Sequence, residues 1–266
     1  MGILRKKTAW EKAYKSVWQQ EEKFLQKYEA RQETKLERKI GEMAPEALVE
    51  TLHSAFCKAF EVVFEKGTGP ILKAAGIEDK RLDYAKNACA VTIKEDKKTL
   101  RAFSKAAGKA GAGNVLLSGA AGIGLGAFGV MLPDVPLLTA MLLKSVYETG
   151  ESYGYRAENE RIYALRLINA ALTDGPALRK KSAFLDRYAQ EGTWGGPVTE
   201  KEEIARAARA LSEAVLYAKV VQNVPVVGAI GGAANGVVLG RVQKYAGIKY
   251  QKRFLIQRKL KKASPV

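Results

Sequence analysis

Two long stretches of this sequence carry no charged side chain, and they limit what the chain can fold into. The first covers residues 110–133 (24 residues) and the second covers residues 220–240 (21 residues). Either stretch is long enough to cross a bilayer as a helix. Their glycine, asparagine and proline content makes insertion only marginally favourable. We therefore expect both to lie in a helical core or to insert shallowly into a membrane, rather than to span it.

Small residues recur at every fourth position in both stretches. The two series are Ser118, Gly122 and Gly126, and then Gly228, Gly232, Gly236 and Gly240. Positions four apart share one helix face, and small residues there let another helix or a lipid approach closely. Glycine inside a helix costs about 1 kcal/mol relative to alanine, so close packing or a ligand must compensate. We predict that the two stretches form helices that pack on each other.

The remaining sequence has helical periodicity and no sustained alternation of polar and apolar residues. From Trp10 to Tyr28, aromatic and apolar residues recur at helical spacing, which predicts an amphipathic helix. Its apolar face either packs on the domain or lies among lipid headgroups. Pro45 suits the first turn of a second helix that runs to Phe64. We expect an all-α, multi-helix domain built around the two glycine-rich helices.

Capping patterns predict where several helices begin. Residues 79–109 are predicted to form one long helix or two shorter ones, and Thr92 and Glu95 have the spacing of a capping box that would start the second. Thr199 and Glu202 have the same spacing ahead of a later helix.

Asp134 is the only charged residue between Lys109 and Lys144. We interpret it as the N-cap of an apolar helix over residues 135–150, because a carboxylate suits a helix N-terminus. A functional acid is the alternative.

Charge is distributed unevenly along the chain, which has a net charge of +16. Residues 1–40 hold 11 basic and 6 acidic residues, residues 41–213 hold 23 and 22, and residues 214–266 hold 10 and none. We expect three parts: a basic amphipathic helix (1–40), a helical domain (41–250) and a basic tail (251–266). A basic block without acidic neighbours favours an external polyanion. The predicted contacts with it are Lys244, Lys249, Lys252, Arg253, Arg258, Lys259, Lys261 and Lys262.

Few residues of the kind that perform chemistry are present. His53 is the only histidine, which argues against a multi-histidine metal site or a Ser-His-Asp triad. Cys57 and Cys89 are interpreted as small core residues. Residues 124–129 match the glycine pattern of a dinucleotide-binding loop, but the strand that such a loop must follow is missing. We expect no cofactor, no metal and no enzymatic activity.

The sequence resembles the EcsC family of bacterial proteins over residues 45–250. The resemblance rests on the segments Gly122–Gly126, Asp134–Pro136, Tyr153–Tyr155, Pro225–Ala229 and Gly231-Gly232 with Asn235. It implies a mostly helical protein that is encoded near an ABC transporter in some bacteria and is linked to transport, secretion or the cell envelope. It implies no catalytic residue.

The charge pattern and the resemblance together predict a non-enzymatic protein on the cytoplasmic side, bound peripherally to the anionic inner face of the cell membrane. The start of the chain supports this location, because residues 1–7 are basic and no apolar signal segment follows. An ABC transporter is the expected protein partner. Lipid binding or transfer by the glycine-rich helices is one alternative. Nucleic-acid binding through the basic end is another, and no recognition motif favours it.

Overall fold

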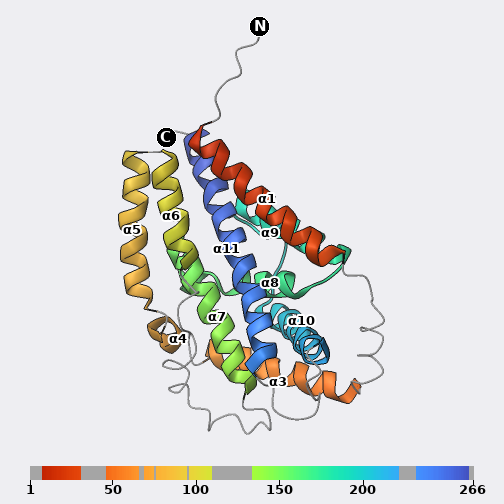
Figure 1. Cartoon of the computed structure of the whole chain (residues 1–266). Helices are drawn as coiled ribbons and strands as arrows, with labels where there is room; N and C mark the ends of the chain where they lie inside the picture. Colours follow the sequence, from red (N-terminus) through yellow and green to blue (C-terminus); the bar gives the residue numbers. More distant parts are fainter. Residues whose placement is uncertain are drawn as a thin grey trace.

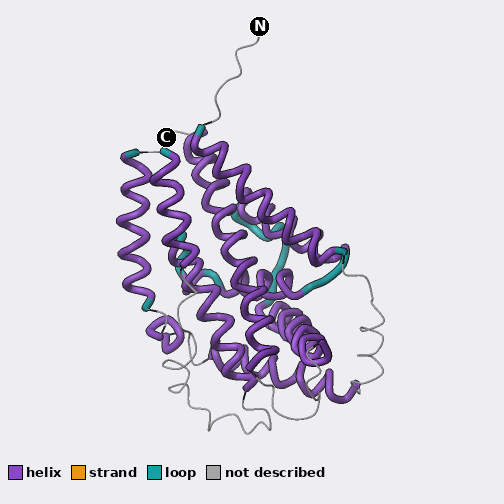
Figure 2. Tube along the Cα trace, in the orientation of Figure 1, coloured by secondary structure: helices purple, strands orange, loops and turns teal. Residues whose placement is uncertain are grey.

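The computed structural model describes residues 8–30, 46–65, 69–74, 76–94, 96–109, 134–221 and 232–263, and these form helices, with short described connections within residues 134–221 (Figures 1 and 2). No strand occurs in these ranges, which confirms the all-α prediction. The helices are α1 (Ala9–Glu29), α3 (Glu46–Glu65), α4 (Gly69–Ala74), α5 (Ile77–Ile93), α6 (Lys97–Lys109), α7 (Asp134–Ser152), α8 (Arg161–Leu172), α9 (Pro176–Glu191), α10 (Glu200–Val221) and α11 (Gly232–Ala263), with a 3₁₀ turn at Ala157–Asn159. The first glycine-rich stretch, and residues 222–231 of the second, lie outside the described residues, so their mutual packing stays a prediction.

Capping side chains explain where two of the helices begin. Thr8 and Glu11 form a complete capping box at the start of α1, with the Thr8 hydroxyl accepting from the Glu11 N–H at 3.1 Å. At α6 the predicted box at Thr92 is wrong. Thr92 lies within α5 and donates its hydroxyl hydrogen to a carbonyl of that helix. Asp96 caps α6 instead, because its carboxylate accepts from the backbone N–H groups of Lys98 and Thr99, each at 2.8 Å.

Helix α11 is the central element of the fold. It is 32 residues long and packs against α1, α7, α8, α9 and α10 (Figure 1). The boundary predicted at residue 250 therefore falls inside one continuous helix. Helix α1 belongs to the same core, since the ring of Phe24 lies 4.8 Å, centroid to centroid, from that of Tyr245 on α11. The amphipathic face predicted for α1 is thus packed on the domain.

Three buried charges and the half-buried Asp186 join α1, α9 and α11. The Lys249 ammonium of α11 lies 2.6 Å from the Glu21 carboxylate of α1 and 2.5 Å from the Asp186 carboxylate of α9. Lys252, one turn later, contacts the same two carboxylates, with 2.7 Å to Asp186. Both lysines are only 1% exposed. The prediction that Lys249 and Lys252 contact an external anionic surface is wrong, because a buried cation needs internal partners and these two have them.

Arg253 is also buried rather than presented to a surface. Its guanidinium lies 2.7 Å from the Glu160 carboxylate and packs over the rings of Tyr155, Tyr163 and Tyr188. The predicted surface contact is therefore wrong for this residue too. The partners of all three cations come from segments far earlier in the chain, where a count of local charges does not reveal them.

The buried charge cluster predicts a large stability difference between two neighbouring glutamates. Glu21→Gln leaves two buried ammonium groups with one carboxylate, and we expect the free energy of unfolding to fall by about 3–5 kcal/mol. Glu22 pairs with Arg179, and both side chains are exposed, so Glu22→Gln should cost no more than about 1 kcal/mol. Urea denaturation followed by circular dichroism measures both values. Equal losses would contradict the assigned role of the cluster.

The same cluster predicts how stability depends on pH. Burial alone raises the pKa of Glu21, but the ammonium groups of Lys249 and Lys252 outweigh burial and hold it below its ordinary value of 4.5. A carboxyl whose pKa is lower in the folded state stabilises the fold above its unfolded pKa, and this contribution is lost as pH falls. We expect the free energy of unfolding to decrease below about pH 4.5. Glu21→Gln should make that decrease smaller in urea titrations at a series of pH values, and an unchanged pH profile would count against this assignment.

Candidate anion-binding groove

A groove with a cavity volume of about 590 Å³ lies between α1, α6 and α11. Among the described residues, five basic residues line it and no acidic residue does. They are Lys12 from α1, Lys97, Arg101 and Lys105 from α6, and Lys244 from α11. We call this surface the basic groove. Because several cations face one concave surface, it is suited to bind anions.

The sequence of α6 explains why one wall of the basic groove is so strongly positive. Lys97, Arg101 and Lys105 follow one another at intervals of four residues, which places them on one helix face. The opposite face is apolar and anchors the helix, because Phe103 is buried and stacks on Phe254 of α11 at 4.7 Å between ring centroids. Like charges four residues apart destabilise a helix slightly. An external anion would relieve this repulsion.

Glycines of α11 keep the basic groove open. Gly240 and Gly247 line it together with Lys244, and a Cβ atom added at either glycine would meet no atom within 4 Å in the part of the chain that the structure describes. The same holds at Gly236, which is exposed. Of the residues predicted from the sequence, Gly240 and Lys244 therefore come together at this surface. Ser118, Gly122, Gly126 and Gly228 lie outside the described residues.

The other predicted contacts lie elsewhere on the molecule. Arg258 is half-buried and donates a hydrogen bond to Thr92, whereas Lys259 is exposed near the end of α11. Gly232 begins α11 and Asp134 begins α7, but the side-chain surroundings of these two positions are not described. The same applies to the side chains of Lys261 and Lys262, although α11 extends past both.

Sequence reasoning missed four of the five cations of the basic groove. Lys97, Arg101 and Lys105 belong to residues 41–213, a region whose basic and acidic residues nearly balance. A count over the single helix Lys97–Lys109 gives the signal that the regional total hides, because this segment has five basic residues and no acidic one. Lys12 could be assigned only from the packing of α1 beside α6.

His53, Cys57 and Cys89 do not come together as a metal site in the described part of the chain. His53 Nε2 lies 3.5 Å from Cys57 Sγ and 3.1 Å from the Ala205 carbonyl oxygen, while Cys89 is exposed on α5. Burial raises the pKa of the Cys57 thiol. Among the described residues, no group of three metal-binding side chains was found. None of the described helices combines the length and apolar character needed to cross a membrane.

The open surroundings of the groove glycines predict that alanine is accepted there. Gly240→Ala and Gly247→Ala should each raise the free energy of unfolding by about 0.5–1 kcal/mol, because alanine favours the helix and no described atom opposes its Cβ. Gly150→Ala is the matched control, since its Cβ would lie 3.0 Å from the Tyr250 ring, and we expect it to destabilise. Urea denaturation distinguishes the two classes. Destabilisation by Gly240→Ala would indicate a close packing partner.

Comparison with known proteins supports the family suggested by the sequence motifs. The model of the EcsC protein family matches residues 7–255. The match extends beyond residues 45–250 and includes α1 and most of α11, the two helices that border the basic groove with α6. No curated protein matches the chain, and no solved structure does. Because the match covers nearly the whole sequence, the chain belongs to the EcsC protein family.

Proposed function

We propose that this protein docks peripherally on anionic phospholipid at the inner face of the cell membrane, with the basic groove as its headgroup site. One observation carries the proposal: five basic side chains from three helices line one groove, and no acidic residue lines it in the part of the chain that the structure describes. On a membrane, the most densely spaced anions available to such a surface are the phosphate groups of the lipids. Each basic residue near an anionic leaflet contributes about 1 kcal/mol, so five support firm but reversible binding.

Exposed apolar side chains at one end of the molecule support the same orientation. The end of α5, the start of α1 and the end of α11 lie close together at the top of Figure 1. Ile93 ends α5 and is 80% exposed, and Leu260 lies in the last turn of α11 and is 46% exposed. Exposed Lys98 and Lys259 accompany them. Apolar tips surrounded by basic residues are typical of proteins that insert shallowly among headgroups.

In this proposal the protein is a non-enzymatic accessory factor, and docking brings it to an ABC transporter or to a secretion or envelope process. The link to a transporter rests on family membership alone. Nucleic acid is the competing polyanion for the same cations. We favour the membrane because the exposed apolar residues at the ends of α5 and α11 have a role at a bilayer and none at a phosphate backbone.

Charge reversal in the basic groove tests the proposal. The double variant Arg101→Glu/Lys105→Glu should weaken binding to phosphatidylglycerol vesicles at least roughly tenfold, because two favourable contacts become repulsive. The control Lys58→Glu/Lys201→Glu changes the net charge equally at exposed positions on α3 and α10 and should bind nearly as the wild type does. Vesicle co-sedimentation at several salt concentrations measures both variants, and phosphatidylcholine vesicles give the neutral reference.

Two results would overturn the proposal. Equal loss by both double variants would show that net charge, and not the groove, determines binding. Absence of binding to anionic vesicles, together with salt-resistant binding to duplex DNA, would favour a nucleic-acid partner.

A further inference from the structure

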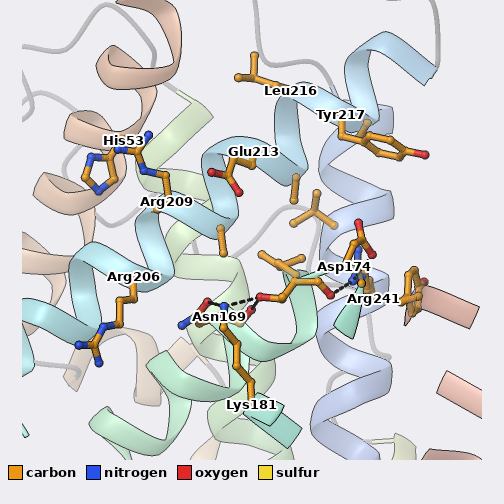
Figure 3. A pocket seen from close by; sticks show the side chains of 18 of the residues that line it. His53, Asn169, Asp174, Lys181, Arg206, Arg209, Glu213, Leu216, Tyr217 and Arg241 are labelled. Atoms are coloured by element: carbon orange, nitrogen blue, oxygen red, sulfur yellow. Dashed lines mark hydrogen bonds and ion pairs between the residues drawn. The ribbon is translucent and has the colours of Figure 1, made fainter. Parts of the chain in front are cut away.

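A second, larger cavity borders α11 and shares no lining residue with the basic groove (Figure 3). Its volume is about 1190 Å³, which is large enough for a small-molecule ligand. Helices α3, α8, α9, α10 and α11, the end of α1 and the turn between α8 and α9 form its walls. Apolar residues line part of it, and its charged lining residues, unlike those of the basic groove, are of both signs.

The apolar wall of this cavity offers a surface for an alkyl chain. It is formed mainly by Leu172, Ala210, Ala214, Leu216, Val237 and Val238. Val237 is 55% exposed, so the protein leaves a large apolar side chain in contact with the cavity and solvent. Covering such a surface with hydrocarbon is favourable because it removes apolar area from water.

Lys181 provides a cation that an anionic headgroup can use. Its ammonium donates to Asn169 Oδ1 at 2.8 Å and to Thr173 Oγ1 at 2.7 Å, which leaves one of its three N–H groups (Figure 3). Among the described residues, Lys181 makes these two hydrogen bonds and no ion pair. Burial lowers the pKa of Lys181, and the negative charge of Glu213 opposes this decrease.

Two further groups shape the polar side of the cavity. Arg241 is held by Asp174 at 2.9 Å and by the Thr173 carbonyl at 2.8 Å, and it lies over the ring of Tyr28. Glu213 faces the cavity from α10. Although part of its side chain is exposed, desolvation raises its pKa. The positive charges of Arg209 and Lys181 oppose that increase.

We propose that this cavity binds one single-chain anionic amphiphile, either a long-chain carboxylate or a monoacyl phosphate. The headgroup accepts a hydrogen bond from the remaining N–H of Lys181, and the alkyl chain lies along the apolar residues of α10 and α11. The single ammonium of Lys181 fits one headgroup, whereas the five cations of the basic groove fit a surface that carries many headgroups. The inference is independent of membrane docking.

Calorimetric titration of the delipidated, full-length protein tests this proposal, with each probe kept below its critical micelle concentration. The probes are dodecanoate, dodecyl phosphate and the neutral dodecanol. We expect saturable binding of one molecule of at least one anionic probe, and binding of dodecanol that is at least roughly tenfold weaker. Whichever anionic probe binds more tightly identifies the headgroup as a carboxylate or a phosphate.

Three variants separate the parts of the proposed site. Lys181→Met should weaken the preferred anionic probe at least roughly tenfold and leave dodecanol unchanged. Val237→Trp should weaken all three probes, because the indole fills the cavity from an exposed position that tolerates it without loss of the fold. The groove variant Arg101→Glu/Lys105→Glu should keep wild-type affinity for the anionic probes. Thermal unfolding confirms that each variant is folded.

Several outcomes would overturn the proposal. The first is that neither anionic probe binds saturably. The second is that dodecanol binds as tightly as the anionic probes. The third is that a folded Val237→Trp or Lys181→Met protein keeps wild-type affinity. Loss of binding in the groove variant would also overturn it, because the amphiphile would then occupy the basic groove.

Discussion

The ion cluster of Glu21, Asp186, Lys249 and Lys252 determines how the outer helices are arranged. Two ammonium groups with 1% exposure are tolerated inside a protein only when carboxylates reach them from other elements. Those carboxylates come from α1 and α9, so α11 is correctly neutralised only when both helices are in place. The remaining buried contacts of α1, such as the packing of Phe24 on Tyr245, depend on this arrangement.

This cluster also separates structural cations from cations that are free to meet a ligand. Three of the eight basic residues expected to face a polyanion are buried and paired within the fold. The surface that is suited to an anion is built instead from α6, together with single residues of α1 and α11. Because side chains of the same type occur in both groups, the surroundings of each residue, and not its identity, decide its role.

The sequence predicted much of the helical architecture, because periodicity and capping act over a few residues. The amphipathic helix at Trp10–Tyr28 is one example, and the division into α5 and α6 is one of the two forms predicted for residues 79–109. The capping residue at that division was misassigned, because the side chains of Thr92 and Asp96 can both cap a helix. The choice between them depends on where α5 ends, and the structure places Thr92 within α5. Of the candidate site, Gly240 and Lys244 were identified from the sequence. Lys12, Lys97, Arg101 and Lys105 were not, because their convergence depends on packing between distant segments.

Helix α11 forms a wall of both surfaces described above. Val237, Val238 and Arg241 line the larger cavity, whereas Gly240 and Lys244, within the same two turns, line the basic groove. A continuous helix moves as a stiff rod, so a small rotation about its axis would reshape both surfaces together. Occupation of one surface would then carry an energetic cost or benefit at the other, and by thermodynamic reciprocity the influence would be the same in both directions.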